Sequence, residues 1–514
     1  MLTPQTALSD FVVEIERTFT QGDAARTVEL IERHPLESWF GLRPERFHEI
    51  LESLTRDGAN ESPFLRVLAA TLLTTNPATV ADQLGGEHSS AAEEPADAQV
   101  TPVDVLVVIG QLFKYRLEGR PVAALEAGKA IDTHASVMTP IFDRTRGWSL
   151  FAAVQLGLTA MLAGDFNQAL MRFKQARMSA RSSALAFLAR DACAKAAVIE
   201  AVYGDTERAR TLLEEADGIA RTESWAEPTI DAAYAIAAAM VRLSEPKEAV
   251  RMLEAIPLGD IGEIWPFYVA ALHRAYAVAG NPQDSARRVA KFEHLPLPAR
   301  EGEGFTGSVM LLCSAATKIS VGDGVAARDA IAKADQNLLL TKLVTAILEL
   351  QVGRPKEALR ITAELSEHTR DLRQLQVWRL SVIAGSYFLL GSIDECRDVF
   401  EFALDLPGGL RPDEAAIFPV QLRELAEEMF EQWPRGAEVD VTSVELYVLQ
   451  QQVLSERELE VLRSLAAGYT REEIAKSHFI SMNTLKAHLR AIYRKLGAGS
   501  RAAAVLEAER RGLI

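Results

Sequence analysis

A small residue recurs at a fixed distance after a turn residue along most of this 514-residue chain. In the segment from Gly164 to Ala169, the alanine follows the glycine by five positions, and apolar residues continue beyond it. Eight segments share this frame, with turn and small residues at Gly119 and Ala124, Gly164 and Ala169, Gly204 and Ala209, Ser244 and Ala249, Gly280 and Ser285, Gly322 and Ala327, Gly353 and Ala358, and Gly391 and Cys396. Their turn residues lie 31 to 45 residues apart, which is enough for two helices in each unit.

The physical reason for the frame predicts helical hairpins. A glycine ends the first helix by adopting positive φ, and the small residue lets the second helix cross closely. Prolines at the start of the second helix cost no hydrogen bond there, and they stand at Pro121, Pro246, Pro282 and Pro355. Each hairpin leaves an apolar face uncovered, so we expect the units to stack into a right-handed superhelix with a concave groove. Gly22 and Ile31 indicate a further unit near the start.

These units resemble tetratricopeptide repeats of about forty residues. In repeats of that class, first-helix positions face the groove. Five aromatic residues lie at or near such positions: Trp225, Trp265, Phe267, Tyr268 and Trp378. They have two possible roles, because rings there can stack on a ligand or peptide, or can pack one repeat against the next.

The last sixty residues carry a different pattern, which predicts a helix-turn-helix. Ser455 with Glu458 and Thr470 with Glu473 form two Ser/Thr-x-x-Glu capping boxes, each of which starts a helix. The expected helices span about 456–467 and 471–477, and a third, capped by Ser481, spans 482–496. A fourth helix follows a cap at residue 500.

The third of these helices has two different faces. An apolar stripe recurs every three or four residues, at Leu485, Leu489, Ile492 and Leu496. The opposite face carries cations with small or polar residues, at Asn483, Lys486, Ala487, Arg490 and Arg494. Such a face suits the major groove of DNA, since Lys and Arg donate to guanine and phosphates while alanine permits close approach. The alternative is a solvated basic face on a bundle helix.

This C-terminal segment resembles the LuxR-type helix-turn-helix, although His478 and Arg471 stand where that family commonly has Leu and Asn. The resemblance implies base contacts by Lys486, Ala487 and Arg490. It implies DNA-backbone contacts by Thr484, Arg494, Lys495 and Arg501. The partners it implies are double-stranded DNA, a second copy bound as a homodimer, and RNA polymerase. For the dimer, the fourth helix offers Ala503, Ala504 and Leu506 as a contact surface.

The net charge of the chain changes sign at the start of this C-terminal segment. Residues 454–514 carry 11 Lys and Arg against 7 Asp and Glu, a net +4, whereas the preceding residues carry 44 against 64, a net −20. A basic module on an acidic body fits a chain that meets DNA only through that module. The expected domains are a helical region with an acidic segment at 83–104, the repeats, a linker and the helix-turn-helix, at 1–104, 105–433, 434–453 and 454–514.

No catalytic or cofactor motif is expected to act. The Gly-Lys pair at Gly128 lacks the other positions of a phosphate-binding loop. The Gly-x-Gly-x-x-Gly match from Gly302 to Gly307 follows two prolines rather than a strand, so we expect a flexible loop between repeats. Three scattered cysteines and nine histidines lack metal spacing. With no signal segment or membrane span in the pattern, a cytoplasmic protein is expected.

The chain as a whole is similar to the repeat and output half of MalT-like regulators, without their nucleotide-hydrolysing domain. The fold class expected is all-α, a tetratricopeptide-like superhelix followed by a four-helix LuxR-type domain. The expected function is sequence-specific transcriptional regulation, controlled by a small molecule or protein in the repeat groove. The alternative is a protein-interaction scaffold that uses the basic module as a DNA tether.

Overall fold

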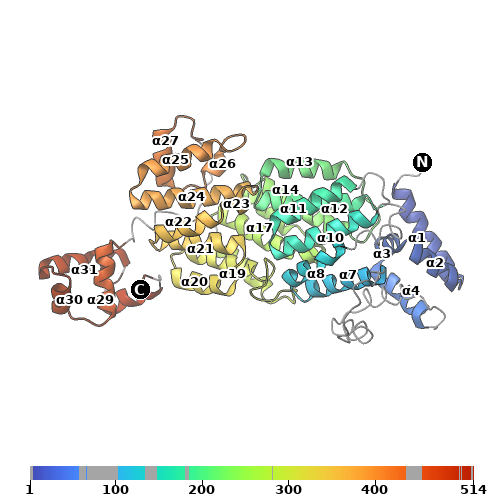
Figure 1. Cartoon of the computed structure of the whole chain (residues 1–514), viewed down its shortest axis with the longest axis horizontal. Coiled ribbons are helices and arrows are strands. Elements are labelled where there is room, and N and C mark those ends of the chain that lie inside the picture. Colours follow the sequence, from blue (N-terminus) through green and yellow to red (C-terminus); the bar gives the residue numbers. More distant parts are fainter. Residues whose placement is uncertain are drawn as a thin grey trace. The chain divides into compact units, whose positions relative to one another are not determined.

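The computed structural model contains only helices and turns among the residues it describes, which confirms the all-α expectation (Figure 1). Among those residues, no helix is both long and apolar enough to cross a membrane. Most of the acidic segment 83–104 and of the linker 434–453 lies outside them. The described residues are 4–56, 65, 102–133, 147–179, 185–280, 282–435, 454–496, 498, 500–510 and 513–514.

Eight helix pairs follow the sequence frame. They are α7 (Pro102–Leu117) with α8 (Pro121–Thr133), α10 (Gly147–Ala163) with α11 (Phe166–Ser179), α12 (Phe187–Val202) with α13 (Thr206–Asp217), α14 (Glu227–Val241) with α15 (Pro246–Glu254), α17 (Trp265–Val278) with α18 (Pro282–Phe292), α19 (Val309–Ser320) with α20 (Gly324–Lys333), α21 (Leu339–Gln351) with α22 (Pro355–Glu364), and α24 (Arg373–Leu390) with α25 (Ile393–Leu404). The four prolines begin α8, α15, α18 and α22, as predicted.

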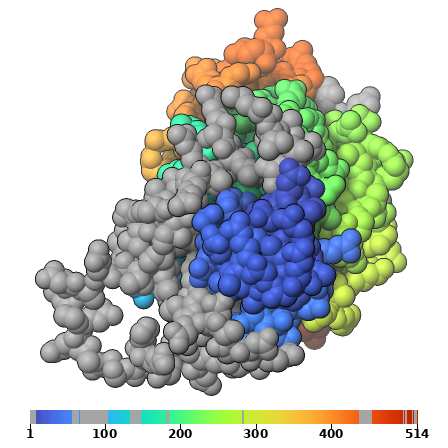
Figure 2. Space-filling view, turned by 90° about the vertical axis from the view of Figure 1, so that its right-hand side faces the viewer, coloured from blue at the N-terminus to red at the C-terminus, as the bar shows by residue number. Residues whose placement is uncertain are grey.

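Other helices lie before, between and after these pairs in the sequence. The N-terminal group, which forms a continuous blue body in Figure 2, is α1 (Pro4–Thr20), α2 (Ala24–Arg33), α3 (Pro35–Gly41) and α4 (Pro44–Arg56). Gly22 joins α1 to α2 with a φ of 74°, so the further hairpin near the start is present. The remaining short elements are α16 (Leu258–Ile261), η2 (Gly262–Ile264), α23 (Ser366–Thr369), α26 (Pro412–Ala415) and α27 (Val420–Met429).

The small residue of every pair is buried. Seven of the eight are 0% exposed and Ser285 is 1% exposed, so no room remains at these crossings for a larger side chain. Six of the turn glycines have positive φ, as predicted: Gly119, Gly164, Gly280, Gly322, Gly353 and Gly391.

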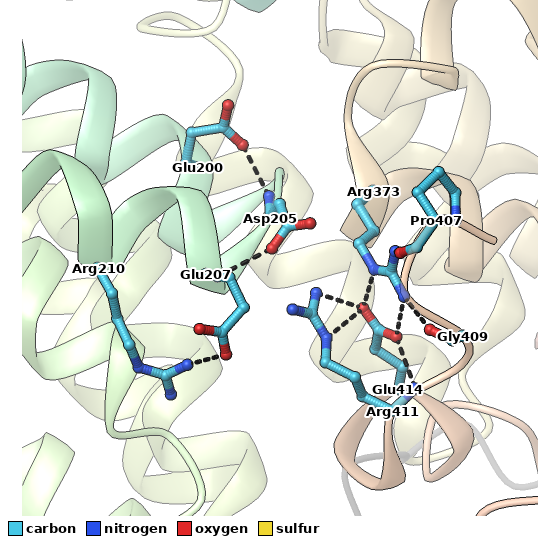
Figure 3. Close-up of polar contacts among 9 residues, drawn as sticks. All are labelled: Glu200, Asp205, Glu207, Arg210, Arg373, Pro407, Gly409, Arg411 and Glu414. Atoms are coloured by element: carbon cyan, nitrogen blue, oxygen red, sulfur yellow. Dashed lines mark hydrogen bonds and ion pairs between the residues drawn. The ribbon is translucent and has the colours of Figure 1, made fainter.

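Gly204 differs from the expectation, because it does not have positive φ. The absence of a side chain at Gly204 instead leaves space for the Glu200 carboxylate. A Cβ atom there would lie 2.1 Å from Glu200 Oε2, the oxygen that accepts a 2.7 Å hydrogen bond from the Asp205 backbone N–H (Figure 3). Gly204 therefore makes room for a buried carboxylate that closes the turn.

The contacts divide the chain into two units. The first comprises 1–242, 248–271 and 296–307, and the second comprises 243–247, 272–295 and 308–514. Within the first, α10 packs against α8, α11 and α12, and α12 packs against α14. Within the second, α19, α21 and α24 each pack against the second helix of their own pair, and α21 also packs against α19 and α24. Neighbouring pairs within a unit thus cover one another.

The glycine-rich segment at 302–307 is a loop, as expected, but it is tied to the first unit. The backbone N–H groups of Phe305 and Thr306 donate to the carbonyls of Ala163 and Leu162, which end α10 and would otherwise lack helical partners. The Phe305 ring is buried, 4.7 Å from the ring of Phe267. The segment 296–307, which contains this loop, is called the strap below.

A buried ion pair joins α24 to α26, which follows the last helix pair of the second unit. Arg373 donates to both Glu414 oxygens at 2.5 and 2.9 Å, and to the carbonyls of Pro407 and Gly409 (Figure 3). Burial raises the pKa of Glu414, but hydrogen bonds from Arg373 and Arg411 outweigh it and leave the pKa below its usual value. Glu414 is therefore ionised at neutral pH.

Glu414→Ala should destabilise the second unit by about 3–5 kcal/mol, because Arg373 is left buried without its counter-charge. Figure 3 also shows the control: Glu207 forms an exposed ion pair with Arg210, and Glu207→Ala should change stability little. Thermal unfolding of both full-length variants tests this difference. Equal effects of the two substitutions would contradict the assigned role of the buried pair.

Candidate nucleic-acid interface

Four helices follow residue 454 and enclose their own apolar core. They are α29 (Glu456–Ala466), α30 (Arg471–Ser477), α31 (Met482–Leu496) and α32 (Arg501–Arg510). The core joins all four, with Leu462 from α29, Ile474 from α30, Ile492 from α31 and Ala504 from α32 wholly buried. The first three of these helices match the predicted ranges to within one residue.

Side-chain caps start these helices as the sequence predicts. Ser455 Oγ accepts from the Glu458 N–H, while Glu458 Oε2 accepts from the Ser455 N–H at 2.6 Å. Thr470 and Glu473 repeat the arrangement, and the hydrogen bond from the Thr470 N–H holds the pKa of Glu473 below its usual value. Ser481 caps α31 through the Thr484 N–H at 3.1 Å. The caps fix where each helix of the turn begins.

The two faces of α31 separate as predicted. All four residues of the apolar stripe are buried, whereas Asn483, Lys486, Ala487 and Arg490 are exposed. Neither the Lys486 amine nor the Arg490 guanidinium makes a hydrogen bond or ion pair with another described residue. Two cations one helical turn apart are thus free to meet an external partner.

The residues that are expected to contact the DNA backbone have different surroundings. Thr484 Oγ1 lies 2.8 Å from Ser481 Oγ on the exposed side of the cap. Arg501 Nη2 donates to the carbonyl of Leu465 at 2.7 Å, so this guanidinium also joins α32 to the end of α29. The sequence pattern did not reveal that internal contact. The side chains of Arg494 and Lys495 lie outside the described residues.

Two residues of α29 form hydrogen bonds with the turn between α30 and α31. Arg457 donates to the carbonyl of His478, and His478 Nε2 lies 2.8 Å from Ser464 Oγ. Within the turn, Phe479 has a φ of 52° and a side chain that is 96% exposed. Arg457 and Ser464 are positioning residues that sequence reasoning missed, because they lie 21 and 14 residues, respectively, from His478 in the turn that they hold.

The aromatic residues expected at the repeat groove differ in exposure. Trp265, Phe267 and Tyr268 are all buried, and the Phe267 ring packs among Phe166, Tyr203 and Phe305, in agreement with the packing alternative. Trp225 and Trp378 are half-buried and keep accessible ring surface. Among the described residues, no group of His, Cys, Asp and Glu could hold a metal ion.

Comparison with known families matches residues 452–508 to the bacterial regulatory proteins of the luxR family. The probable transcriptional regulatory protein NarL of Mycobacterium tuberculosis is 45% identical over 62 residues, which cover 12% of this chain and 29% of that protein. The chain therefore spans less than a third of the length of this relative. The C-terminal four helices are a luxR-family helix-turn-helix domain.

A second kind of relative aligns over a longer stretch at lower identity. The response regulator protein VraR of Staphylococcus epidermidis is 27% identical over 204 residues, or 38% of this chain and 85% of that protein. VraR of Staphylococcus aureus is 26% identical over the same length. The relatives named here are regulatory proteins, in agreement with a regulatory role for the domain.

Phe479→Gly should stabilise the domain by about 0.5–1 kcal/mol, because the left-handed backbone conformation costs a phenylalanine more than a glycine and the exposed ring loses no packing. The control is Lys476→Gly in α30, which should cost about 1 kcal/mol. Urea unfolding of residues 440–514, which include the whole core described above, measures both. A lower midpoint for Phe479→Gly would contradict the prediction.

Proposed function

We propose that this chain is a sequence-specific DNA-binding transcriptional regulator that inserts α31 into the major groove. The observation that carries the proposal is the pair of exposed, internally uncommitted cations, Lys486 and Arg490, on a helix whose other face is buried. In the rest of the chain many cations, such as Arg373 and Arg190, are engaged with carboxylates. Uncommitted donors on a rigid helix are what base recognition needs.

Each exposed residue has a separate part in this arrangement. Lys486 and Arg490 donate to guanine edges, and Ala487 between them allows the helix backbone to approach the bases. Thr484, Arg494, Lys495 and Arg501 contact phosphates and set the position of the helix on the duplex. The acidic remainder of the chain repels DNA, so binding is confined to this domain.

Lys486→Ala and Arg490→Ala should each weaken binding to the specific site by about 1–3 kcal/mol while leaving unfolding unchanged. Arg463→Ala is the matched control, since it removes the same charge from an exposed position of α29. Affinities on the selected site and on a scrambled duplex, at two salt concentrations, separate base recognition from bulk charge. If all three variants lose equal affinity on both duplexes, α31 is not the reading helix.

We further propose that the domain binds as a dimer through α32. Leu506 is 69% exposed and Ala503 is exposed beside it, so they offer an apolar surface to a second copy. Ala504, expected in the same surface, is instead buried in the domain core, because it lies on the inward side of α32. Two half-sites about one helical turn apart require such a pairing.

Leu506→Arg should abolish dimer formation and lower affinity for a two-half-site operator, because it places a charge in an apolar contact. Ala466→Arg, at an exposed end of α29, is the control and should leave the dimer intact. Analytical ultracentrifugation of the protein with the operator gives the stoichiometry. One monomer of wild-type protein on a full operator would overturn the dimer.

The repeat units, in this proposal, receive an effector and adjust the affinity of the domain for DNA. An effector acts only by binding two arrangements with different affinity, typically a coupling of about 1–3 kcal/mol. Support for this part is the accessible surface in the repeat units, at Trp225 in particular. Full-length protein and residues 440–514 should then bind the operator with different affinities when the effector is present, and identical affinities would overturn the coupling.

A further inference from the structure

A cavity of about 360 Å³ lies within the first unit, between the N-terminal helices and the helices that follow. Its walls come from α3, α7, α10, α12, α14 and η2, so segments far apart in sequence share it. The volume falls at the lower end of the range for small-molecule sites, which is about 300–1,000 Å³. It is too small for a helix of a partner protein.

One wall of the cavity is aromatic and fixed in place. The Trp225 ring stacks on Phe40 with centroids 5.9 Å apart, and it meets the Trp39 ring edge-on at 5.5 Å. Its indole N–H donates to the backbone carbonyl of Trp39 at 2.7 Å. Trp225 therefore has its polar atom satisfied and keeps ring surface for a flat apolar group.

A buried ion pair lies in the same cavity. Lys195 and Asp191, one turn apart on α12, are 4% and 7% exposed and form an ion pair with each other. An ammonium group has three N–H donors, and Asp191 is the sole described residue that accepts one from Lys195. A buried charge with unused donors is costly unless another acceptor meets it.

The other cation of the cavity is already committed. Arg116 donates to both oxygens of Glu263 at 2.9 and 2.5 Å, and to Gln155 Oε1 at 2.9 Å. It has little capacity left for a ligand. Lys195 is therefore the charged donor in the cavity that remains open to an acceptor.

We infer that this cavity binds a small amphipathic molecule with a flat apolar body and a carboxylate. The body lies on Trp225, and the carboxylate accepts hydrogen bonds from Lys195. Asp191 orients the ammonium, and the positive charge of Lys195 disfavours a cationic ligand. The inference names the effector class of the proposed function and rests on that function only for the effect on DNA binding.

Two probes of similar shape and opposite charge, 2-naphthoate and 2-naphthylmethylamine, test the charge requirement on the full-length protein. Each probe competes with the dye 1-anilinonaphthalene-8-sulfonate, and the fall in dye fluorescence measures the competition. Naphthoate should compete at least about tenfold better than the amine, since a hydrogen bond to a charged group is worth roughly 1.5–3 kcal/mol. Equal competition by the two probes would overturn the inference.

Three variants locate the site. Ala226→Phe fills the cavity without removing a contact and should abolish probe binding, whereas Val321→Phe, at an exposed position of the second unit, should not. Lys195→Met combined with Asp191→Leu removes both charges together, which avoids stranding either one. This double variant should keep probe binding but lose the preference for naphthoate. Unchanged affinity in Ala226→Phe would overturn the inference.

Operator affinity measured with and without naphthoate separates the two proposals. If the wild-type protein binds the operator but does not bind the probe, the cavity proposal alone is overturned. Charge-selective probe binding that leaves operator affinity unchanged would support the cavity as a ligand site and overturn its role as sensor of this output. The Lys486→Ala variant should bind the probe normally, because its substitution lies in α31 rather than at the cavity.

Discussion

The repeat region depends on close contact at the helix crossings, where a side chain of one carbon or little more is wholly buried in every pair. A larger residue there would push the helices apart or strain the core. Because the contact recurs in eight pairs, each pair presents a similar apolar face to the next, and neighbouring pairs within a unit cover one another. The turn glycines and helix-starting prolines set where each crossing falls.

Three buried guanidinium groups contrast with the cations at the proposed sites. Arg373, Arg190 and Arg116 each satisfy their donors with carboxylates or carbonyls, so they stabilise the fold without offering capacity to a ligand. Lys486 and Arg490 differ because they are exposed and uncommitted, and Lys195 differs because it is buried and only partly satisfied. Chemistry available to a partner lies where the protein leaves donors unused.

Features with local causes were predictable from the sequence. The capping boxes at Ser455 and Thr470, the prolines that start helices and the small buried residues depend on neighbours within a few positions, so the pattern contains the cause. Features with distant causes were not predictable. Phe267 is buried because Phe305 lies against it, Arg501 meets Leu465 across the domain, and the cavity joins Trp39 to Trp225. No spacing rule reveals such pairings.

Because the strap belongs to the first unit, that unit is not one continuous segment of the chain. Residues 272–295 and those from 308 onward, on either side of the strap, belong to the second unit. A fragment that stops at residue 271 leaves the carbonyls of Leu162 and Ala163 exposed and removes Phe305 from its aromatic cluster. Exchange of this unit between related chains by recombination therefore has to carry two separate segments of the gene together, which favours inheritance of both units as a block.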